Sequence, residues 1–291
     1  MDPTFRFKNS NKDIEIYELL ASGKISSKRL GKFLKGKNAP IRALAVSYLD
    51  KSDEKRMVEI YRNDPSSAVR MQALKNLADN RSDTFTKILI EAANDNSEFI
   101  RRIATVWMGD VGKSEYIPIL ADLRVNDPSK RVQFNAKSAL DQIDPEMASE
   151  ACKKKILELP QSSWRTALLK RTEASFARTK EWIWDELIKN IEDTTLEVTK
   201  RIRSVRTFRN YRFQQAIKNL LNVALDHEEI TDLRMALLEA LGWFTFSSQR
   251  DAIIAACDQI LKNENESADI RRVALMTKTR LLEGPTNSIT P

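Results

Sequence analysis

The chain has 291 residues, of which 42% are hydrophobic and 31% are charged, with only 7 glycines and 9 prolines. This composition supplies enough apolar material for a continuous core and excludes a disordered chain. The scarcity of glycine and proline argues against an all-β protein and against a glycine-rich nucleotide-binding fold, whose turns and phosphate loops need them. The formal net charge of +7 permits an anionic partner without requiring one.

The first predicted element is a short helix close to the N-terminus. Apolar residues at Ile14, Ile16 and Leu19 precede a stop at Gly23, so we expect residues 1–23 to form a capping helix. The first eleven residues contain no hydrophobic signal core, and no apolar run in the chain approaches the roughly 20 residues of a membrane span. We therefore expect a soluble, cytoplasmic protein.

One short pattern recurs along the chain: an apolar residue, usually an arginine next, and a second apolar residue four positions after the first. Its eight copies begin at Ile41, Val69, Ile100, Val132, Trp164, Val198, Leu233 and Ile270. Successive copies begin 28 to 37 residues apart. Further apolar residues seven or eight positions after the first complete one face of a helix. Residues that cap helices, such as Asp64, Asp127 and Ser162, precede most copies.

A second amphipathic segment lies between consecutive copies of the pattern. Examples are residues 85–92, 117–123, 182–191 and 252–260, and residues 27–35 play this part in the first unit. Each unit is therefore predicted to be helix A, a short turn and helix B, where helix B carries the pattern. A single hairpin of this length cannot bury its apolar face alone, so neighbouring units must stack around a shared core.

The sequence resembles the HEAT-repeat family. The resemblance rests on the segments 64–73 and 127–132 and covers about residues 38–284, although Gln133 and Thr199 stand where the family has arginine. It implies an all-α fold, a right-handed α-solenoid of about eight HEAT-like hairpins over residues 24–284. Residues 285–291 show no periodicity, so we expect a flexible tail there. The resemblance also implies a structural role for the repeated arginine, which bonds a turn aspartate of its own or a neighbouring unit. The arginines concerned are Arg42, Arg70, Arg101, Arg234 and Arg271.

Positions two and six residues after the start of each copy point away from the core, at about 200° and 240° around helix B. The resemblance implies that this side lines a concave surface, and we call these positions the inner stripe. Its predicted partner-binding residues are Met71, Lys75, Arg102, Val106, Phe134, Lys170, Lys200, Met235, Arg272 and Met276. Apolar side chains in a row where solvent favours polar ones indicate a contact surface. The first hypothesis is therefore a non-enzymatic scaffold that holds a protein segment.

Residues 165–218 form a basic region that supports an alternative hypothesis. Its candidate contacts for an anionic partner are Lys200, Arg201, Arg203, Arg206, Arg209, Tyr211 and Arg212. No acid occurs between Glu197 and Asp226. Cations interleaved with aromatic residues can hold phosphates and stack bases, so this alternative is a nucleic-acid-binding solenoid. We expect the helix to end near Asn210, with Arg209 and Arg212 in the following turn.

The sequence contains little that could support catalysis. Its single histidine, His227, lies in an acidic turn, and its two cysteines, Cys152 and Cys257, are predicted to be buried thiols. No zinc-type cysteine pair and no phosphate-binding glycine motif occurs. We therefore predict no catalytic residues, no metal and no cofactor.

One enzyme class on this architecture stays open as a second alternative. Some HEAT-like solenoids are DNA glycosylases that excise alkylated bases with aromatic, acidic and basic residues on the concave face. The residues that resemble those ingredients are Trp164, Arg165, Trp182, Trp184 and Asp185. However, Trp164 occupies a predicted core position, and Glu239 is the one acid of the inner stripe. HEAT-like lyases that attach bilin pigments are a further relative, with no specific residue here in their favour.

Overall fold

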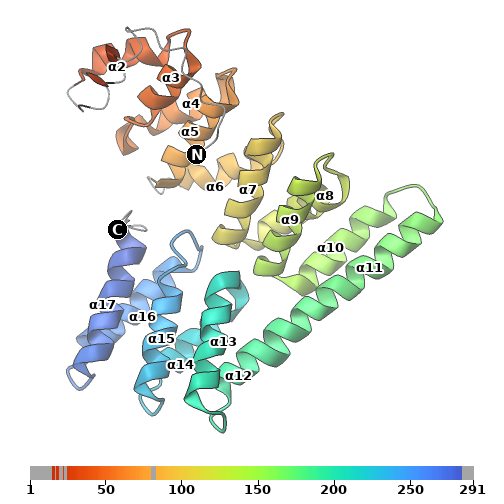
Figure 1. Cartoon of the computed structure of the whole chain (residues 1–291), viewed down its shortest axis with the longest axis vertical. Helices are drawn as coiled ribbons and strands as arrows, with labels where there is room; N and C mark the ends of the chain where they lie inside the picture. Colours follow the sequence, from red (N-terminus) through yellow and green to blue (C-terminus); the bar gives the residue numbers. More distant parts are fainter. Residues whose placement is uncertain (1–14, 17, 20–21, 23–24, 80–82, 284–291) are drawn as a thin grey trace. The chain divides into compact units, whose positions relative to one another are not determined.

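The computed structural model describes residues 15–16, 18–19, 22, 25–79 and 83–283. Regular structure over these residues is helical throughout, which confirms the predicted all-α fold (Figure 1). The helices of residues 25–143 are α2 (Ser27–Leu34), α3 (Ala39–Val46), η1 (Lys51–Asp53), α4 (Glu54–Asn63), α5 (Ser67–Asp79), α6 (Asp83–Ala92), α7 (Glu98–Val111), η2 (Ser114–Tyr116), α8 (Ile117–Asn126) and α9 (Lys130–Ile143). The later helices are α10 (Pro145–Leu157), α11 (Ser163–Lys180), η3 (Glu181–Ile188), α12 (Lys189–Glu192), α13 (Val198–Tyr211), η4 (Gln214–Ala216), α14 (Ile217–Leu225), α15 (Thr231–Leu241), α16 (Arg250–Lys262) and α17 (Ala268–Glu283). The predicted capping helix at 1–23 lies largely outside the described residues, and the predicted tail at 285–291 lies wholly outside them.

The chain divides into two compact units, unit 1 (residues 1–101) and unit 2 (residues 102–291). In unit 1, α5 packs against both α3 and α4. In unit 2, α13, α15 and α17 lie side by side in one layer, and α14 and α16 form a second layer behind them (Figure 1). The front layer consists of predicted helices B and the second layer of predicted helices A, as the repeat requires.

The periodic apolar residues form the core at most copies of the pattern. Val69, Ile100, Val132, Leu233 and Ile270 are all buried, with at most 1% of their surface exposed. Capping side chains fix where these helices begin. For α9, Oγ of Ser129 accepts a hydrogen bond from the N–H of Val132, which satisfies a backbone donor that has no partner within the helix.

The repeat is irregular between α10 and α12. α11 continues through η3, a π-helical segment, into α12, so that the helix B predicted at Trp164 and the helix A predicted at Trp182 form one uninterrupted helix. The first part of α11 packs mainly against α10, and this pair projects from the rest of unit 2 (Figure 1). Trp164 is 61% exposed, so its predicted core position is wrong. A core position in a solenoid needs a neighbouring unit on each side, which the projecting end of α11 lacks.

We expect Trp164→Ala to lower the free energy of unfolding by less than about 1 kcal/mol, because most of the indole is already in water. Phe176→Ala on the same helix is expected to cost more than about 2 kcal/mol, because its ring is 1% exposed and the ammonium of Lys137 lies 4.1 Å from its centroid. Urea unfolding followed by circular dichroism compares the two. A cost for Trp164→Ala equal to that for Phe176→Ala would show that the indole is packed.

Both cysteines are buried and free, as predicted. Burial raises the pKa of Cys152 to about 12 and that of Cys257 to about 11. The thiolate, which is the nucleophile and metal ligand, is therefore scarce at neutral pH, and both side chains act as small core residues.

Candidate binding surface

The repeated arginines join each helix B to the turns beside it. Arg42 Nε donates to Asp64 Oδ2 at 2.8 Å, and its Nη1 donates to the carbonyl of Gly36 at 2.9 Å. Arg70 bonds Asp95 at 2.7 Å and the carbonyl of Asp64 at 3.0 Å in the same manner. Both guanidiniums are largely buried. The predicted bond to a turn aspartate is confirmed for these two arginines.

The remaining repeat positions follow this scheme to different degrees. Arg234 donates to the carbonyl of Ala224 at 3.0 Å and to Glu266 at 2.6 Å, so its partner is a glutamate. Arg101 donates to the carbonyl of Asp95 at 2.9 Å. Gln133 replaces arginine by donating to the carbonyl of Asp127 at 2.7 Å. For Arg271, no side-chain hydrogen bond occurs within the described part of the chain, where no turn acid follows α17.

Arg201 belongs to this structural set, so its prediction as a contact for an anionic partner is wrong. The side chain is 1% exposed. Its Nε and Nη2 donate to the carbonyl of Ile191 at 2.9 and 2.7 Å, and its Nη1 lies 2.9 Å from Glu229 Oε1. Arg201 and Arg234 each bond a carbonyl ten residues upstream and a glutamate in the following turn. The buried acid therefore removes Arg201 from the surface.

This pairing moves the register of α13 by two residues relative to the predicted one. Arg201 occupies the repeat-arginine position predicted for Thr199, so this copy of the pattern begins at Lys200. Ser204 is consequently buried, with 6% of its surface exposed. Ile202 and Arg206 take its place on the inner stripe, and Arg206 corresponds to Glu239 one repeat later.

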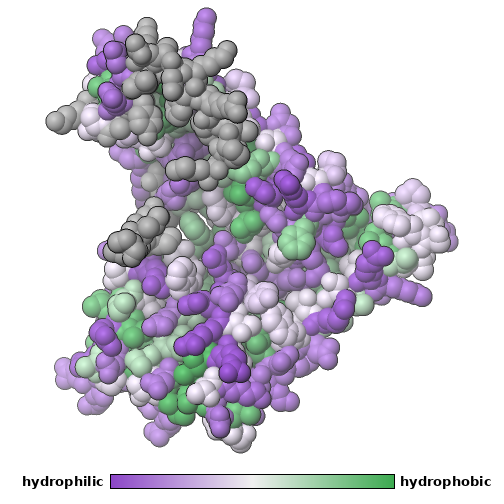
Figure 2. Space-filling model, viewed as in Figure 1, coloured by the Kyte–Doolittle hydropathy of each residue, from purple (hydrophilic) through white to green (hydrophobic). Residues whose placement is uncertain are grey.

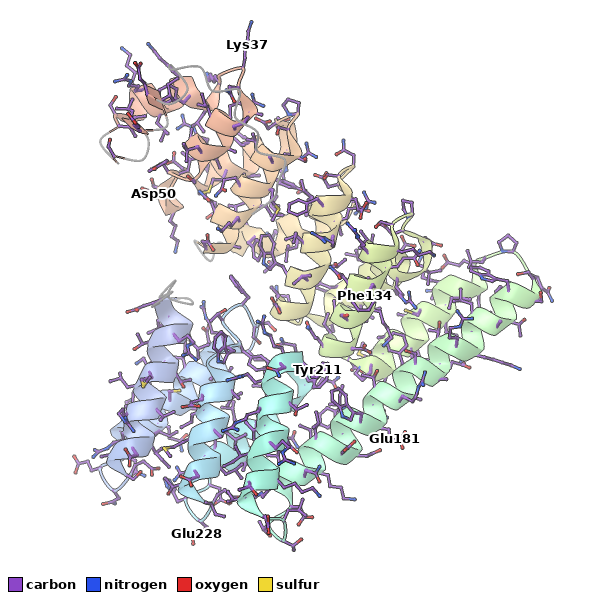
Figure 3. The ribbon with its side chains drawn as sticks, in the orientation of Figure 1. Lys37, Asp50, Phe134, Glu181, Tyr211 and Glu228 are labelled. Carbon is purple, nitrogen blue, oxygen red and sulfur yellow. The ribbon has the colours of Figure 1, made fainter. Side chains whose placement is uncertain are left out.

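The other predicted residues of the inner stripe are exposed to different degrees. In unit 1, Met71 is half-buried and Lys75 is exposed. In unit 2, Arg102 and Met235 are half-buried, and the exposed members are Val106, Phe134, Lys170, Arg272 and Met276. Lys200 is also exposed, but the shifted register of α13 places it at the start of its copy and not on the inner stripe. Figure 3 labels Phe134, whose ring on α9 is 69% exposed. In the space-filling view, hydrophobic residues are scattered among hydrophilic ones over the helices of unit 2 (Figure 2).

Side chains from α13, α15 and α17 meet at a shallow pocket of about 190 Å³ in unit 2. Trp243 lies in the turn after α15 and is 39% exposed. The guanidinium carbon of Arg209, from α13, lies 5.8 Å from the centroid of the indole, and that of Arg280, from α17, lies 4.7 Å from it. Both distances fall within the range of a cation–π interaction. We call Arg209, Trp243 and Arg280 the clamp.

The clamp presents two cations beside a single acid of the pocket lining. Over the residues that the structure describes, neither Arg209 nor Arg280 forms an ion pair. Glu239 and Met276 line the same pocket, and Met276 is 59% exposed. The pocket therefore combines two positive groups, one negative group and apolar surface at a single place.

Sequence reasoning included Arg209 but missed Trp243 and Arg280. Each lies ten residues after the start of its copy, at Leu233 and Ile270. A position ten residues after the start continues the inner stripe by one further helical turn, at about 280°. Trp243 and Arg280 could therefore have been predicted from the sequence by extending the inner stripe from the positions two and six residues after each start to the position ten residues after it.

The exposed cations of α13 extend beyond the clamp. Lys200, Arg203 and Arg206 are exposed. The helix ends at Tyr211, close to the predicted end at Asn210, and Arg212 follows in the left-handed conformation with φ 51°. Arg209 therefore lies in the last helical turn and not after it. The ring of Tyr211 is half exposed and stacks on Phe213 with 5.7 Å between centroids (Figure 3).

The sequence profile of HEAT repeats matches residues 54–141, which span α4 to α9. Residues 54–141 of this chain are therefore HEAT repeats. No curated protein matches the chain. Among solved structures, it is similar to human deoxyhypusine hydroxylase in complex with glycerol, with 16% identity, 83% of this chain and 100% of that chain covered, and a TM-score of 0.35. It is also similar to YibA of E. coli, with 17% identity, 94% of this chain and 89% of that chain covered, and a TM-score of 0.35.

The structure separates Trp164 and Arg165 from the other residues that resemble a glycosylase site. Trp164 and Trp182 lie on one continuous helix, and a rise of 1.5 Å per residue places them about 27 Å apart. Trp182 packs edge-on against Tyr211, with 4.6 Å between centroids. Two tryptophans so far apart cannot flank a single base.

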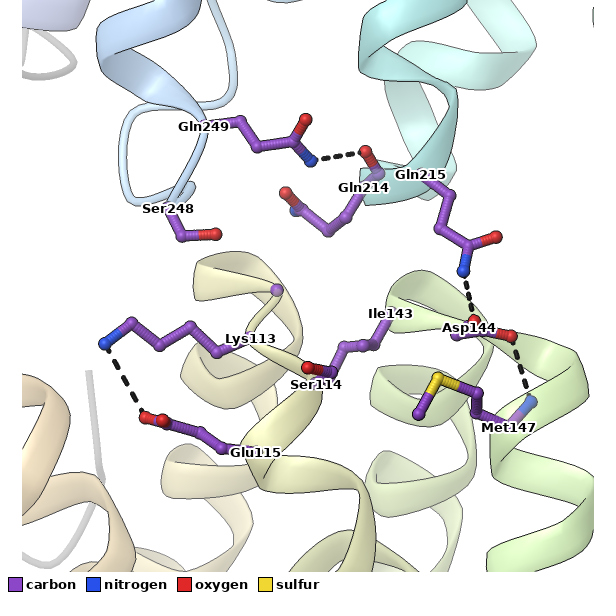
Figure 4. A pocket seen from close by; sticks show the side chains of 11 residues that line it. Lys113, Ser114, Glu115, Ile143, Asp144, Met147, Gln214, Gln215, Ser248 and Gln249 are labelled. Atoms are coloured by element: carbon purple, nitrogen blue, oxygen red, sulfur yellow. Dashed lines mark hydrogen bonds and ion pairs between the residues drawn. The ribbon is translucent and has the colours of Figure 1, made fainter.

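A polar pocket of about 380 Å³ lies where α7 and α9 end against η4 and the loop before α16 (Figure 4). Gln214 is 2% exposed, and its Nε2 donates to the carbonyl of Asp110 at 3.1 Å. Its Oε1 accepts a hydrogen bond of 2.7 Å from Ser247, and Gln249 donates to its carbonyl at 2.7 Å. Gln215 bonds Asp144 across the same pocket (Figure 4). These bonds join two parts of unit 2 and mark a structural junction.

Burial raises the pKa of Asp110 at the edge of this junction, and the guanidinium of Arg212, 2.9 Å away, opposes that shift. His227 Nδ1 lies 3.2 Å from Glu266 Oε2 in a different turn. In the described ranges, no three His, Cys, Asp or Glu side chains are placed to hold a metal ion. No helix among the described residues is both long and apolar enough to cross a membrane.

Proposed function

We propose that this protein is a non-enzymatic scaffold that holds a segment of a protein partner on the inner stripe of unit 2. The observation that carries the proposal is the exposure of Phe134, Met276 and Val106, at 69%, 59% and 41%, which occupy inner-stripe positions of α9, α17 and α7. Single exposed apolar residues are ordinary, but their recurrence along the inner stripe indicates a contact surface. The free, buried cysteines support a cytoplasmic location, where thiols stay reduced.

Phe134→Glu combined with Met276→Glu is expected to lower partner recovery at least about tenfold, because two desolvated apolar contacts become charged. The matched control is Leu157→Glu with Trp164→Glu, which changes two equally exposed apolar residues on the projecting α10–α11 pair. The measurement is quantitative mass spectrometry of proteins retained by each immobilised variant, with helicity checked by circular dichroism. Unchanged recovery with the stripe variant, or equal loss with the control, would contradict the proposal.

Nucleic-acid binding is the second candidate, and the exposed cations of α13 support it. Lys200, Arg203 and Arg206 have no acidic partner in the described part of the chain. If they hold phosphates, affinity for DNA or RNA falls steeply with salt, because each phosphate contact releases a counterion. A mobility shift with mixed single-stranded DNA and RNA at low salt tests this, and the absence of any shift there removes the candidate.

A further inference from the structure

The arginines of the clamp have a different kind of partner from the buried repeat arginines. Arg234 and Arg201 are buried and each has its own glutamate. Arg209 and Arg280 are half-buried, and the guanidinium of each lies over the ring of Trp243. A guanidinium that lies over an aromatic ring keeps its N–H edge available for hydrogen bonds. The indole therefore holds two donor groups in place, one from each neighbouring helix.

We infer that the clamp binds the carboxylate of an Asp or Glu side chain of the partner segment, so that this segment is an acidic peptide. The inference rests on the proposed function and specifies the chemistry of its partner. A carboxylate accepts two parallel N–H bonds from a guanidinium, and such charge-assisted bonds are the stronger class of hydrogen bond. Charge complementarity also extends to Arg206, which is exposed on the same face of α13.

The remaining lining of the pocket favours a peptide over a nucleic acid. Glu239 lies among the lining residues and would repel every phosphate of a strand that passes over the clamp, whereas a peptide can place one carboxylate on the guanidiniums and an uncharged or basic group beside Glu239. The same carboxylate can accept a hydrogen bond from a peptide N–H or from a lysine side chain. Met276 offers 59% of its surface to an apolar neighbour. The best-matched ligand is therefore an acidic residue next to an apolar one in an extended or helical segment.

The test uses a random twelve-residue peptide library displayed on phage and panned on the full chain. Wild-type protein is expected to enrich peptides that contain Asp or Glu beside an apolar residue. Fluorescence anisotropy with a labelled enriched peptide then compares variants. Arg209→Glu with Arg280→Glu is expected to weaken binding at least about tenfold, because the carboxylate would meet like charges. Lys154→Glu with Arg171→Glu makes the same change in net charge on the α10–α11 pair and is expected to leave affinity within about twofold.

Four results would overturn the clamp assignment. Enriched peptides without acidic residues would do so, as would equal affinity for Arg209→Glu/Arg280→Glu and wild type, provided that Phe134→Glu/Met276→Glu still abolishes binding. In both cases the proposed function survives, because the inner stripe still holds a peptide. Competition by a twenty-residue oligo-dT at low salt would assign the clamp to nucleic acid. If wild type enriches no peptide at all, the proposed function and the clamp assignment fall together.

Discussion

Arg201→Met is expected to lower the free energy of unfolding by about 3–5 kcal/mol, because it leaves Glu229 buried without its cation. Glu229 is 8% exposed as a side chain and lies 2.5 Å from the guanidinium. The same substitution also removes two hydrogen bonds to the carbonyl of Ile191, which lies at the end of α12. Urea unfolding at neutral pH measures the loss.

Arg206→Met on the same helix is the matched control, and its expected effect is within about 0.5 kcal/mol, since Arg206 is exposed. Equal effects of the two substitutions would mean that Arg201 faces solvent and that the predicted register was right. Removing both charges in Arg201→Met/Glu229→Met is expected to recover most of the stability, because no buried charge remains unpaired.

The pair also predicts a pH dependence with a definite sign. The hydrogen bond from Arg201 holds the pKa of Glu229 below its ordinary value of 4.5. A lowered pKa in the folded state contributes stability that is present above pH 4.5 and is lost as pH falls through the folded value. The stability difference between wild type and Glu229→Gln should therefore narrow below pH 4.5. A difference that stays constant down to pH 3 would show that the carboxylate is not paired.

Gly112→Ala is expected to lower the free energy of unfolding by about 4 kcal/mol, through two effects that act together. Gly112 has φ +73°, a left-handed conformation that alanine adopts only with strain. A Cβ at this position would also overlap the side chain of Gln214, whose buried amide holds the junction between α7 and η4. The backbone strain and the steric overlap both destabilise the same junction, so we expect a single cooperative urea transition with a lower midpoint.

Gly31→Ala provides the opposite control. Gly31 lies inside α2 with ordinary helical φ, and among the described residues no atom would contact its Cβ. Replacing a helical glycine with alanine is expected to raise stability by about 0.5–1 kcal/mol. Calorimetry of the two variants measures whether Gly112→Ala lowers and Gly31→Ala raises the stability. A Gly112→Ala variant as stable as wild type would mean that Gln214 does not occupy the junction.

The fold could be predicted from the sequence because the apolar pattern recurs at a regular spacing along the chain. Each copy places an apolar residue at its start, and those at Val69, Val132 and Leu233 are buried as the pattern predicts. The burial of Trp164 was predicted wrongly, because the spacing of apolar residues does not show whether a neighbouring unit packs over them. The register at Arg201 was also predicted wrongly, because a buried glutamate 28 residues away sets it. A short stretch of sequence around Trp164 or Arg201 contains neither piece of information.

The candidate site was predictable only in part, for the same physical reason. The exposure of Phe134 and Met276 follows from helical periodicity alone. The clamp requires that the last turns of α13 and α17 lie on either side of the turn after α15, which is a property of how the helices stack. Single-helix reasoning placed Arg209 near a turn but could not bring Trp243 and Arg280 to it.

Site-specific photo-crosslinking tests the central claim, that the helix-B side of unit 2 is the working surface, most directly. A benzoylphenylalanine is placed at Met276 in one protein and at Gln259, an exposed residue of α16 in the helix-A layer, in another. After irradiation in the native cell and nuclease treatment, we expect Met276 to yield a crosslinked protein partner and Gln259 to yield none. Crosslinks from Gln259 alone, or equally from both positions, would contradict the account.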